Sequence, residues 1–430
     1  MSTPTPVRRL VVVGASLAGL RAVEAARRTG FDGEVVLIGD EVHPPYDRPP
    51  LSKAFLGVEG ERGAGEAAHF RTEEVLRTEL GVDLRLGVRA TGLDTGAREV
   101  LLGEDRVPYD ALVVATGSRP RWLPGTDPAV DGPVEGVTQL RTLDDARTVR
   151  DAFEAGARVV VVGAGFIGSE VASAARKRDL PVTVVEALDL PLTRSIGPDV
   201  GAACAEIHRA AGTDLRLGTG VAGLATEEHD GRRRVTGVRL DDGEVLPADL
   251  VVLGIGVRPA TEWLEGSGVA LHEADGGVVV DATMATNVPG VWAAGDVAHV
   301  ANPLYDGEHH RLEHWTNAAD HGAAAARHAL DPAAAQPVVT VPYFWSDWYD
   351  HRLQFVGTPR ADEVRVVVDD LADGGGLVAL YRRGDVVAGA FVIDLPRQVM
   401  KLRKRIADRG PWDEAVEFAT TTAAAARARA

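Results

Sequence analysis

The most regular pattern of apolar and polar positions covers residues 158–186. An apolar run, Val159 to Val162, ends at the segment Gly-Ala-Gly-Phe-Ile-Gly, and a stretch with helical periodicity follows. A second apolar run, Val182 to Val185, then ends at Glu186. Strand, glycine-rich turn, helix and strand in this order predict a βαβ unit with a dinucleotide-binding fingerprint.

The three glycines of this turn, Gly163, Gly165 and Gly168, have separate roles in such a unit. The first permits the tight turn, the second lets the backbone approach a pyrophosphate, and the third lets helix and strand pack closely. The helix N-terminus then faces the negative charge. Glu186 lies where a carboxylate binds ribose hydroxyls, and no Arg or Lys follows it before Arg194. The sequence therefore predicts NAD(H) rather than NADP(H).

Residues 9–40 repeat this pattern near the start of the chain. The turn keeps the first and third glycines and replaces the second by a small residue, giving Gly14, Ser16 and Gly19. The second strand ends just before Asp40 and Glu41, so one of these carboxylates binds ribose, and Asp40 is favoured. Two fingerprints in one chain predict two bound dinucleotides.

A second repeat supports a duplication. Residues 110–120 align without gaps with residues 249–259, and each segment predicts a buried parallel strand that ends in small residues at a turn. Ligand crevices of open α/β sheets lie at such strand ends. Further along, residues 286–296 predict a short strand that delivers Gly295 and Asp296 to the head of the following helix, where an acid can bind a polyol.

The order of elements predicts an α/β protein with two Rossmann-like domains, similar to glutathione reductase, and a small α+β C-terminal domain. The expected boundaries are residues 1–118 and 248–330 for the first domain, 119–247 for the second and 331–430 for the third. In the third, three strands of an antiparallel sheet are expected at Val364–Asp369, Gly376–Arg382 and Val386–Ile393. A basic, helix-like stretch follows, and the Ala-rich tail, residues 420–430, is either a helix end or disordered.

Composition excludes several classes of protein. The 430 residues carry a net charge of −17, which argues against a nucleic-acid binder. No apolar run approaches the roughly 20 residues of a membrane span, and the N-terminus has no signal-peptide pattern. The one cysteine, Cys204, excludes an internal disulfide and suits a reducing cytoplasm. A cytoplasmic protein without membrane attachment is expected.

Four further motifs carry a resemblance to a known family. They are YDRPPLSK at 46–53, LEHWTNA at 312–318, VPYFWSD at 341–347 and LQFVG at 353–357. With the two fingerprints, the chain resembles over nearly its whole length the FAD-dependent NADH:ferredoxin reductases of the rubredoxin and putidaredoxin type. These belong to the flavoprotein pyridine nucleotide-disulfide oxidoreductase superfamily and feed electrons to bacterial monooxygenases and dioxygenases. The resemblance implies FAD in the first domain and NAD(H) in the second.

The resemblance also implies a set of site residues. Contacts with FAD are expected for Ala18, Asp40, Lys53, Val88, Arg141, Asp296 and Trp315. Contacts with NAD are expected for Gly163, Gly165, Ile167, Gly168, Glu170, Glu186 and Gly256. The other candidate cofactor-binding residues are Gly14, Ser16, Gly19, Arg48, Thr116, Gly117 and Gly295. Lys53 is the expected catalytic cation near the flavin and Glu170 its partner, although a surface ion pair of little worth is an equal alternative.

The expected reaction follows from the two carriers. NADH gives up a hydride whereas an iron–sulfur protein accepts single electrons, and flavin can connect the two. The stretch Pro45 to Leu56 has no cysteine, which disfavours thiol substrates. The alternatives are an NADH oxidase and an NADH-responsive redox-sensing flavoprotein. Two interpretations of the basic stretch are open: it is a docking surface for ferredoxin, or it is an ordinary solvated helix face. The basic stretch includes Arg397, Lys401, Arg403, Lys404 and Arg405.

A metal site is not expected. The histidines that invite one fit no closed ligand set by their spacing; they are His309, His310, His314, His321 and His328.

Overall fold

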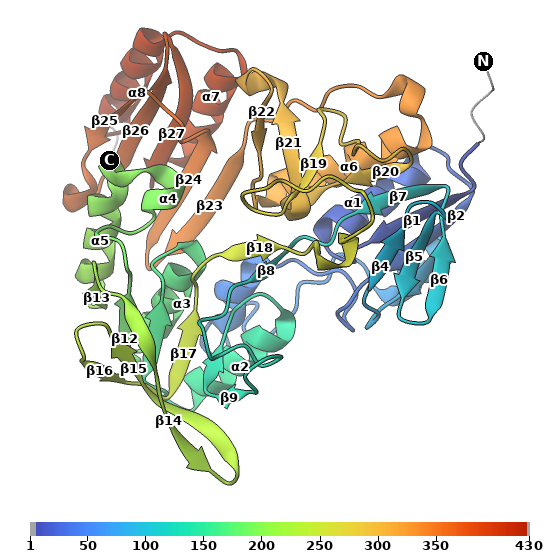
Figure 1. The fold of residues 1–430 in the computed structure, drawn as a ribbon. Coiled ribbons are helices and arrows are strands. Elements are labelled where there is room, and N and C mark those ends of the chain that lie inside the picture. Colours follow the sequence, from blue (N-terminus) through green and yellow to red (C-terminus); the bar gives the residue numbers. More distant parts are fainter. Residues whose placement is uncertain (1–5, 428–430) are drawn as a thin grey trace. The chain divides into compact units, whose positions relative to one another are not determined.

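The computed structural model describes residues 6–427 and divides the chain into two compact units. The first unit comprises Met1–Asp47, His69–Arg119 and Val257–Pro342, and the second comprises Arg48–Ala68, Pro120–Gly256 and Tyr343–Ala430, within the described range. Each unit is built around a parallel sheet (Figure 1). No helix among residues 6–427 is both long and apolar enough to cross a membrane.

The core of the first unit is a five-stranded parallel sheet of order β20-β7-β1-β2-β3. Its strands are fully or largely buried because they are apolar runs covered by helices. In register, Val11 lies opposite Val36 on one side and Leu112 on the other. Helices α1 and α6 contact each other and the sheet. The bounds are β1 Arg9–Val13, α1 Leu17–Arg28, β2 Glu34–Ile38, β3 Val82–Arg85, β7 Ala111–Val114, β20 Val291–Ala293 and α6 Trp315–Leu330.

Smaller elements complete the first unit. Two three-stranded sheets have the orders β4-β5-β6 and β19-β21-β22, and β8 pairs with β18. The helix expected at Asp296 is only a 3-10 turn, Gly295–Val297, and strand β21 follows it at once. The bounds are β4 Gly92–Asp94, β5 Glu99–Leu102, β6 Asp105–Pro108, β8 Ser118–Pro120, β18 Val257–Pro259, β19 Val278–Val280, β21 Ala298–Asn302 and β22 Glu308–His310.

The second unit contains a second five-stranded parallel sheet, of order β10-β17-β11-β12-β13. Strand β17 pairs with β11 along its whole length, so this sheet continues past residue 247, the expected end of the second domain. The bounds are β10 Val137–Thr138, α2 Leu143–Glu154, β11 Val159–Val162, α3 Phe166–Lys177, β12 Val182–Val185, α4 Thr193–Ile196, α5 Gly201–Ala210, β13 Asp214–Arg216 and β17 Leu250–Leu253. A smaller sheet is formed by β9 Val134–Glu135, β14 Val221–His229, β15 Arg232–Leu240 and β16 Val245–Pro247.

The C-terminal part of the second unit is an antiparallel sheet of order β23-β24-β27-β26-β25. The three expected strands are confirmed, and two others precede them. A core of Trp348, Phe355, Tyr381 and Phe391 fills one face of this sheet. The basic stretch is helical, and the Ala-rich tail is helical up to Arg427; residues 428–430 lie outside the described range. The bounds are β23 Tyr343–Trp348, β24 His351–Gly357, β25 Glu363–Asp369, β26 Leu377–Arg383, β27 Val386–Ile393, α7 Pro396–Ala407 and α8 Trp412–Arg427.

Candidate functional site

The first fingerprint forms a turn that only glycine can make. Gly14 follows β1 with φ +121, and a Cβ there would lie 2.0 Å from the carbonyl oxygen of Ala115. A Cβ on Gly19 would lie 1.9 Å from the carbonyl oxygen of Gly14, so helix α1 packs directly on the turn. The expected roles of the first and third glycines are therefore met in the geometry.

The start of α1 suits an anion. Ser16 is its N-cap residue, and the first turn holds no acidic side chain. Unpaired N–H groups and the helix dipole place partial positive charge at this end. A pyrophosphate group fits such a terminus.

Asp40 is the better placed of the two candidate ribose carboxylates. The Glu41 carboxylate accepts a hydrogen bond from the Tyr46 hydroxyl at 2.5 Å. Asp40 stays 46% exposed at the end of β2 and pairs with Arg119 at 3.1 Å. The backbone N–H of Val88 donates to Gly39 at 2.9 Å, which brings Val88 beside the same strand end.

Two other predicted residues of the first unit adjoin the start of α1. A Cβ on Gly295 would lie 3.1 Å from the Cβ of Ala18, so the two positions touch. The Asp296 carboxylate accepts from the Ser118 hydroxyl at 3.1 Å, next to the predicted residues Thr116 and Gly117 after β7. The strand ends of β1, β7 and β20 thus bring distant sequence segments together.

Trp315 begins α6 in the same unit. Its indole N–H donates to Asp47 at 2.8 Å. Gly322, about two turns further along α6, was not predicted, although a Cβ there would lie 2.1 Å from the carbonyl oxygen of Ala18. The sequence did contain a signal for Gly322, because a glycine within an alanine-rich helix indicates that another backbone segment approaches closely.

The second fingerprint repeats the geometry of the first. Gly163 has φ +102, and a Cβ there would lie 2.4 Å from the carbonyl oxygen of Gly254. A Cβ on Gly168 would lie 2.2 Å from the carbonyl oxygen of Gly163. Gly254 aligns with Ala115 in the second sequence repeat, so the same backbone contact recurs in both units. Gly165 is the N-cap residue of α3, and Ile167 in its first turn is exposed.

Glu186 lies at the end of β12 and contacts the fingerprint directly. Its carboxylate accepts from the backbone N–H of Ala164 at 2.8 Å and of Leu188 at 2.9 Å. In Rossmann-like domains, a carboxylate at this strand end accepts hydrogen bonds from ribose hydroxyls, and this role of Glu186 remains a prediction. Gly256, the other predicted residue of this sheet, has φ +94, and its carbonyl oxygen accepts from the N–H of Arg121 at 2.9 Å.

The variant Glu186→Gln is expected to reduce the preference for NADH over NADPH at least tenfold in kcat/KM, about 1.4 kcal/mol. The amide lacks the negative charge, and its NH₂ group opposes one of the two backbone donors. Steady-state reduction of ferricyanide with both coenzymes measures the ratio. Asp214→Asn, an acid at the opposite end of the neighbouring strand β13, is the control. An unchanged ratio in Glu186→Gln would remove Glu186 from coenzyme selection.

Lys53 and Glu170, both in the second unit, form the predicted ion pair. Lys53 Nζ lies 2.7 Å from Glu170 Oε1, and Glu170 is only 2% exposed, so the alternative of a surface pair does not hold. The hydroxyls of Ser52 and Ser346 also donate to the Glu170 carboxylate. The indole N–H of Trp348 donates to the Ser346 hydroxyl at 2.8 Å. These donors hold the carboxylate in one orientation and so fix the Lys53 ammonium.

Arg141, which was expected to contact FAD, and Arg48, a candidate cofactor-binding residue, both lie in the second unit. An Arg48 N–H donates to the carbonyl oxygen of Arg141 at 2.6 Å, and the Arg141 N–H donates to Asp145 at 3.0 Å. Their roles, like that of Lys53 toward FAD, remain predictions.

Helix α7 carries the basic stretch on its outer face. Val399, Leu402 and Ile406 are buried on its inner face. The side chains of Arg397, Lys401 and Lys404 are exposed, whereas Arg403 and Arg405 are half-buried, and Arg405 stacks 4.4 Å from the ring of Phe418. We call Arg397, Lys401 and Lys404 the α7 basic face.

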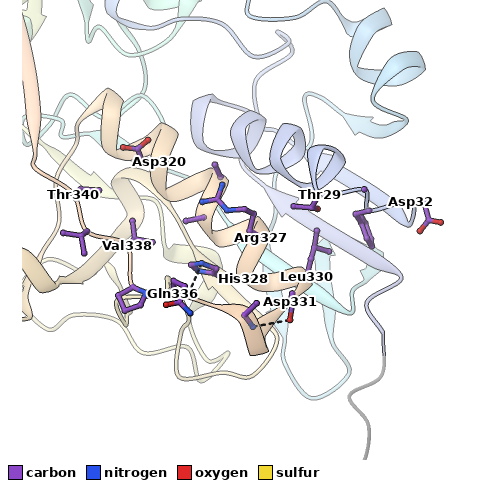
Figure 2. A pocket seen from close by; sticks show the side chains of 17 residues that line it. Thr29, Asp32, Asp320, Arg327, His328, Leu330, Asp331, Gln336, Val338 and Thr340 are labelled. Carbon is purple, nitrogen blue, oxygen red and sulfur yellow. Dashed lines mark hydrogen bonds between the residues drawn. The ribbon is translucent and has the colours of Figure 1, made fainter.

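A groove of about 880 Å³ also lies in the first unit (Figure 2). It is lined by the C-terminal ends of α1 and α6 and by residues 336–340. It contains none of the predicted site residues, because those residues lie at the carboxyl ends of the strands, where α1 and α6 begin.

The five histidines considered for a metal lie on β22 and around α6. His314 precedes α6 and His321 lies within it, and burial lowers the pKa of each to about 4. Both rings are therefore neutral at physiological pH. His328 Nδ1 bonds to the carbonyl oxygen of Thr283 at 2.8 Å.

Comparison with known proteins agrees with this geometry. Residues 8–322 match the family described as pyridine nucleotide-disulphide oxidoreductase, and residues 343–423 match the reductase C-terminal domain. Putidaredoxin reductase CamA of Pseudomonas putida is 34% identical over 423 residues, 97% of each chain. The ferredoxin–NAD(+) reductase component of the p-cumate 2,3-dioxygenase system of Pseudomonas putida is 35% identical over 412 residues, 95% of each. The crystal structure of the covalent putidaredoxin reductase–putidaredoxin complex is similar with a TM-score of 0.85, 34% identity and 94% coverage of each chain.

Two parallel sheets with matching glycine turns define a protein that binds two dinucleotides. The chain belongs to the pyridine nucleotide-disulphide oxidoreductase family, and its predicted kinship with the FAD-dependent ferredoxin reductases is confirmed. The predicted fold class is confirmed as well.

Proposed function

We propose that this protein is an FAD-dependent reductase that takes a hydride from NADH and passes electrons singly to a ferredoxin that serves an oxygenase. The main support is the duplicated glycine turn, which provides one dinucleotide site in each unit, together with relatives named as reductases of putidaredoxin and of dioxygenase ferredoxins. When bound, the flavin supplies the conversion from two-electron to one-electron transfer.

Each unit then binds one of the two dinucleotides. In the first unit, the Gly14 turn admits the FAD pyrophosphate, Asp40 holds its ribose and Asp296 its polyol. In the second unit, the Gly163 turn admits the NADH pyrophosphate and Glu186 holds its ribose. Both sites use backbone N–H groups and carboxylates, which orient their ligands without acid–base chemistry.

Lys53 and Glu170 are proposed as the residues that act on the reaction itself. Glu170 is held by two hydroxyls and fixes the Lys53 ammonium. A fixed cation stabilises developing negative charge without reorganisation. We assign to Lys53 the stabilisation of the negative charge on reduced flavin.

Thiol chemistry is not part of the proposal. Cys204 is buried, and burial raises the pKa of its thiol to about 12, so the reactive thiolate does not form near neutral pH. The position of the family's redox disulfide, within residues 45–56, holds no cysteine. A reducing compartment, the cytoplasm, suits such a chain.

Anaerobic mixing with NADH or NADPH tests the function. Rapid bleaching of the flavin by NADH, followed by cytochrome c reduction only after a [2Fe–2S] ferredoxin is added, is the expected result. Slow bleaching without ferredoxin stimulation would favour a redox sensor. In a separate aerobic assay, rapid oxygen consumption without a carrier would favour an NADH oxidase.

Ferredoxin docking on the α7 basic face is a further expected outcome. Lys404 is paired with Asp408 at 2.6 Å, so Arg397 and Lys401 make the face positive although the chain carries a net charge of −17. The face can therefore attract an acidic carrier locally. Arg397→Glu/Lys401→Glu is expected to lower kcat/KM for a stimulating ferredoxin about tenfold and to weaken its salt dependence. Reduction of ferricyanide by NADH should stay unchanged.

Arg232→Glu/Arg239→Glu, at two exposed positions of β15, is the matched control with the same total change of charge. Equal losses in both variants would point to net charge alone. Unchanged ferredoxin turnover in the α7 variant would place the docking surface elsewhere.

A further inference from the structure

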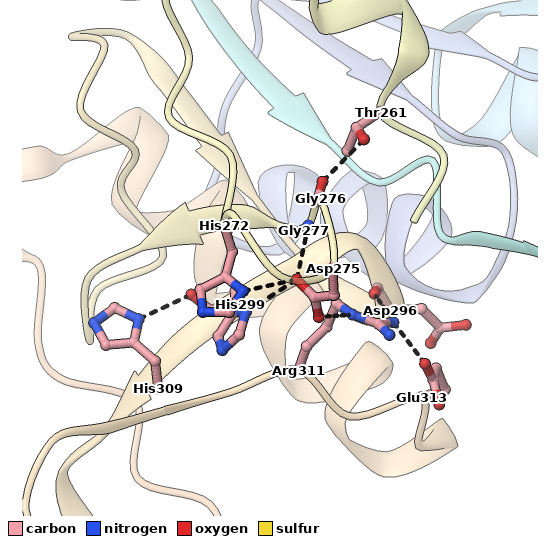
Figure 3. A network of polar contacts seen from close by, with 10 residues as sticks. All are labelled: Thr261, His272, Asp275, Gly276, Gly277, Asp296, His299, His309, Arg311 and Glu313. Atoms are coloured by element: carbon pink, nitrogen blue, oxygen red, sulfur yellow. Dashed lines mark hydrogen bonds and ion pairs between the residues drawn. The ribbon is translucent and has the colours of Figure 1, made fainter. Parts of the chain in front are cut away.

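Two histidines and one aspartate form a compact cluster in the first unit (Figure 3). His272 and Asp275 lie in the segment before β19, and His299 lies on β21. One ligand atom from each side chain lies within 4.8 Å of the others. The Nδ1 atoms of His272 and His299 are 3.1 Å and 3.4 Å from Asp275 Oδ1. None of the three is a predicted cofactor-binding residue.

The two separations from Asp275 Oδ1 are close to the spacing of metal ligands. Metal–ligand bonds of 2.0–2.2 Å in a tetrahedral site separate neighbouring ligand atoms by roughly 3.3–3.6 Å. Small side-chain rotations therefore suffice to bring all three atoms to one ion. Imidazole nitrogen with carboxylate oxygen is a donor set that Zn²⁺ and similar divalent ions accept.

The burial of His299 gives a further indication. Its side chain is only 9% exposed, and its Nδ1 faces Asp275 Oδ1 at 3.4 Å but makes no well-formed hydrogen bond among the described residues. A buried nitrogen without a well-formed hydrogen bond is unfavourable, and a metal ion would satisfy it.

The surroundings of Asp275 orient its carboxylate toward the two rings. Arg311 Nε donates to Oδ2 at 2.6 Å, and the Gly277 N–H donates to Oδ1 at 3.1 Å. Outer contacts of this kind fix metal ligands in position. The side chain of His272 is 39% exposed, which leaves a path for the ion and for water.

We propose that His272, Asp275 and His299 bind one divalent transition-metal ion, with water completing the coordination. Arg311 donates both to Asp275 and to the carbonyl oxygen of Asp296, at 3.2 Å, so the ion would stabilise the turn that carries Asp296. This site contains none of the residues proposed to bind a cofactor or to act on the reaction, although His299 lies on β21, which directly follows the Asp296 turn. Its presence does not depend on the reductase activity.

Calorimetric titration of the untagged flavoprotein with Zn²⁺, after chelator treatment and dialysis, tests the site. We expect one ion per chain and a Tm that rises with Zn²⁺ concentration. His272→Gln should weaken binding at least tenfold, and His299→Ala at least as much. Co²⁺ should give ligand-field bands that His272→Gln abolishes.

His309→Gln is the control, since His309 Nδ1 bonds to the backbone oxygen of His299 at 3.3 Å and His309 lies outside the three-residue group. It should bind Zn²⁺ as the parent protein does. His272 is partly exposed, so its variant remains informative if His299→Ala fails to fold. Absence of binding at millimolar Zn²⁺, or equal binding by His272→Gln and the parent, would overturn the proposal.

Discussion

Gly14→Ala is expected to yield a protein that retains almost no flavin and unfolds at a markedly lower temperature. Gly14 has φ +121, and the new Cβ would lie 2.0 Å from the carbonyl oxygen of Ala115. Backbone strain of about 1–3 kcal/mol and overpacking of about 1–3 kcal/mol add to a loss on the order of 4 kcal/mol. The displaced turn would also move the α1 N-terminus away from the FAD pyrophosphate. The flavin-to-protein absorbance ratio and the Tm measure the two effects.

Gly30→Ala is the matched control for this prediction. Gly30 follows the same helix with φ +83, but a Cβ there meets nothing within 4 Å. Gly30→Ala should therefore lower the free energy of unfolding by only about 1–2 kcal/mol, through backbone strain, and leave flavin binding intact. If the two variants retain flavin equally, the close contact with Ala115 does not govern FAD binding.

Lys53→Met is expected to slow flavin reduction by NADH at least tenfold and to destabilise the protein. Removing one partner of a buried ion pair costs about 3–5 kcal/mol. Lys53 is 19% exposed and Glu170 keeps two hydroxyl donors, so a loss of about 2 kcal/mol is expected here. Anaerobic stopped-flow absorbance measures the rate of reduction, and thermal unfolding followed by circular dichroism measures stability.

Two companion variants separate the catalytic from the structural contribution of Lys53. Lys53→Arg keeps the charge and should retain most of the rate. Lys53→Met/Glu170→Gln removes the uncompensated charge, so it should regain stability and stay slow. Full recovery of the reduction rate in the double variant would assign Lys53 a purely structural role.

The sequence by itself determined the two nucleotide folds and their glycine turns. A turn that needs positive φ and admits no Cβ can be made only by glycine, so Gly14 and Gly163 signal their conformation locally. Apolar runs of strand length and the spacing to Asp40 and Glu186 are equally local. The pairing of Lys53 with Glu170 was also anticipated, but through family resemblance rather than through any local pattern.

Only the tertiary structure decided which distant segments meet. Ser346 lies 176 positions from Glu170, yet it donates to that carboxylate. Strand β17 joins the second sheet rather than the first, and Asp275 reaches the Asp296 turn through Arg311. The cluster of His272, Asp275 and His299 joins two separate segments of the chain. Such contacts depend on the path of the chain through space. No local sequence pattern around the contacting residues indicates that path.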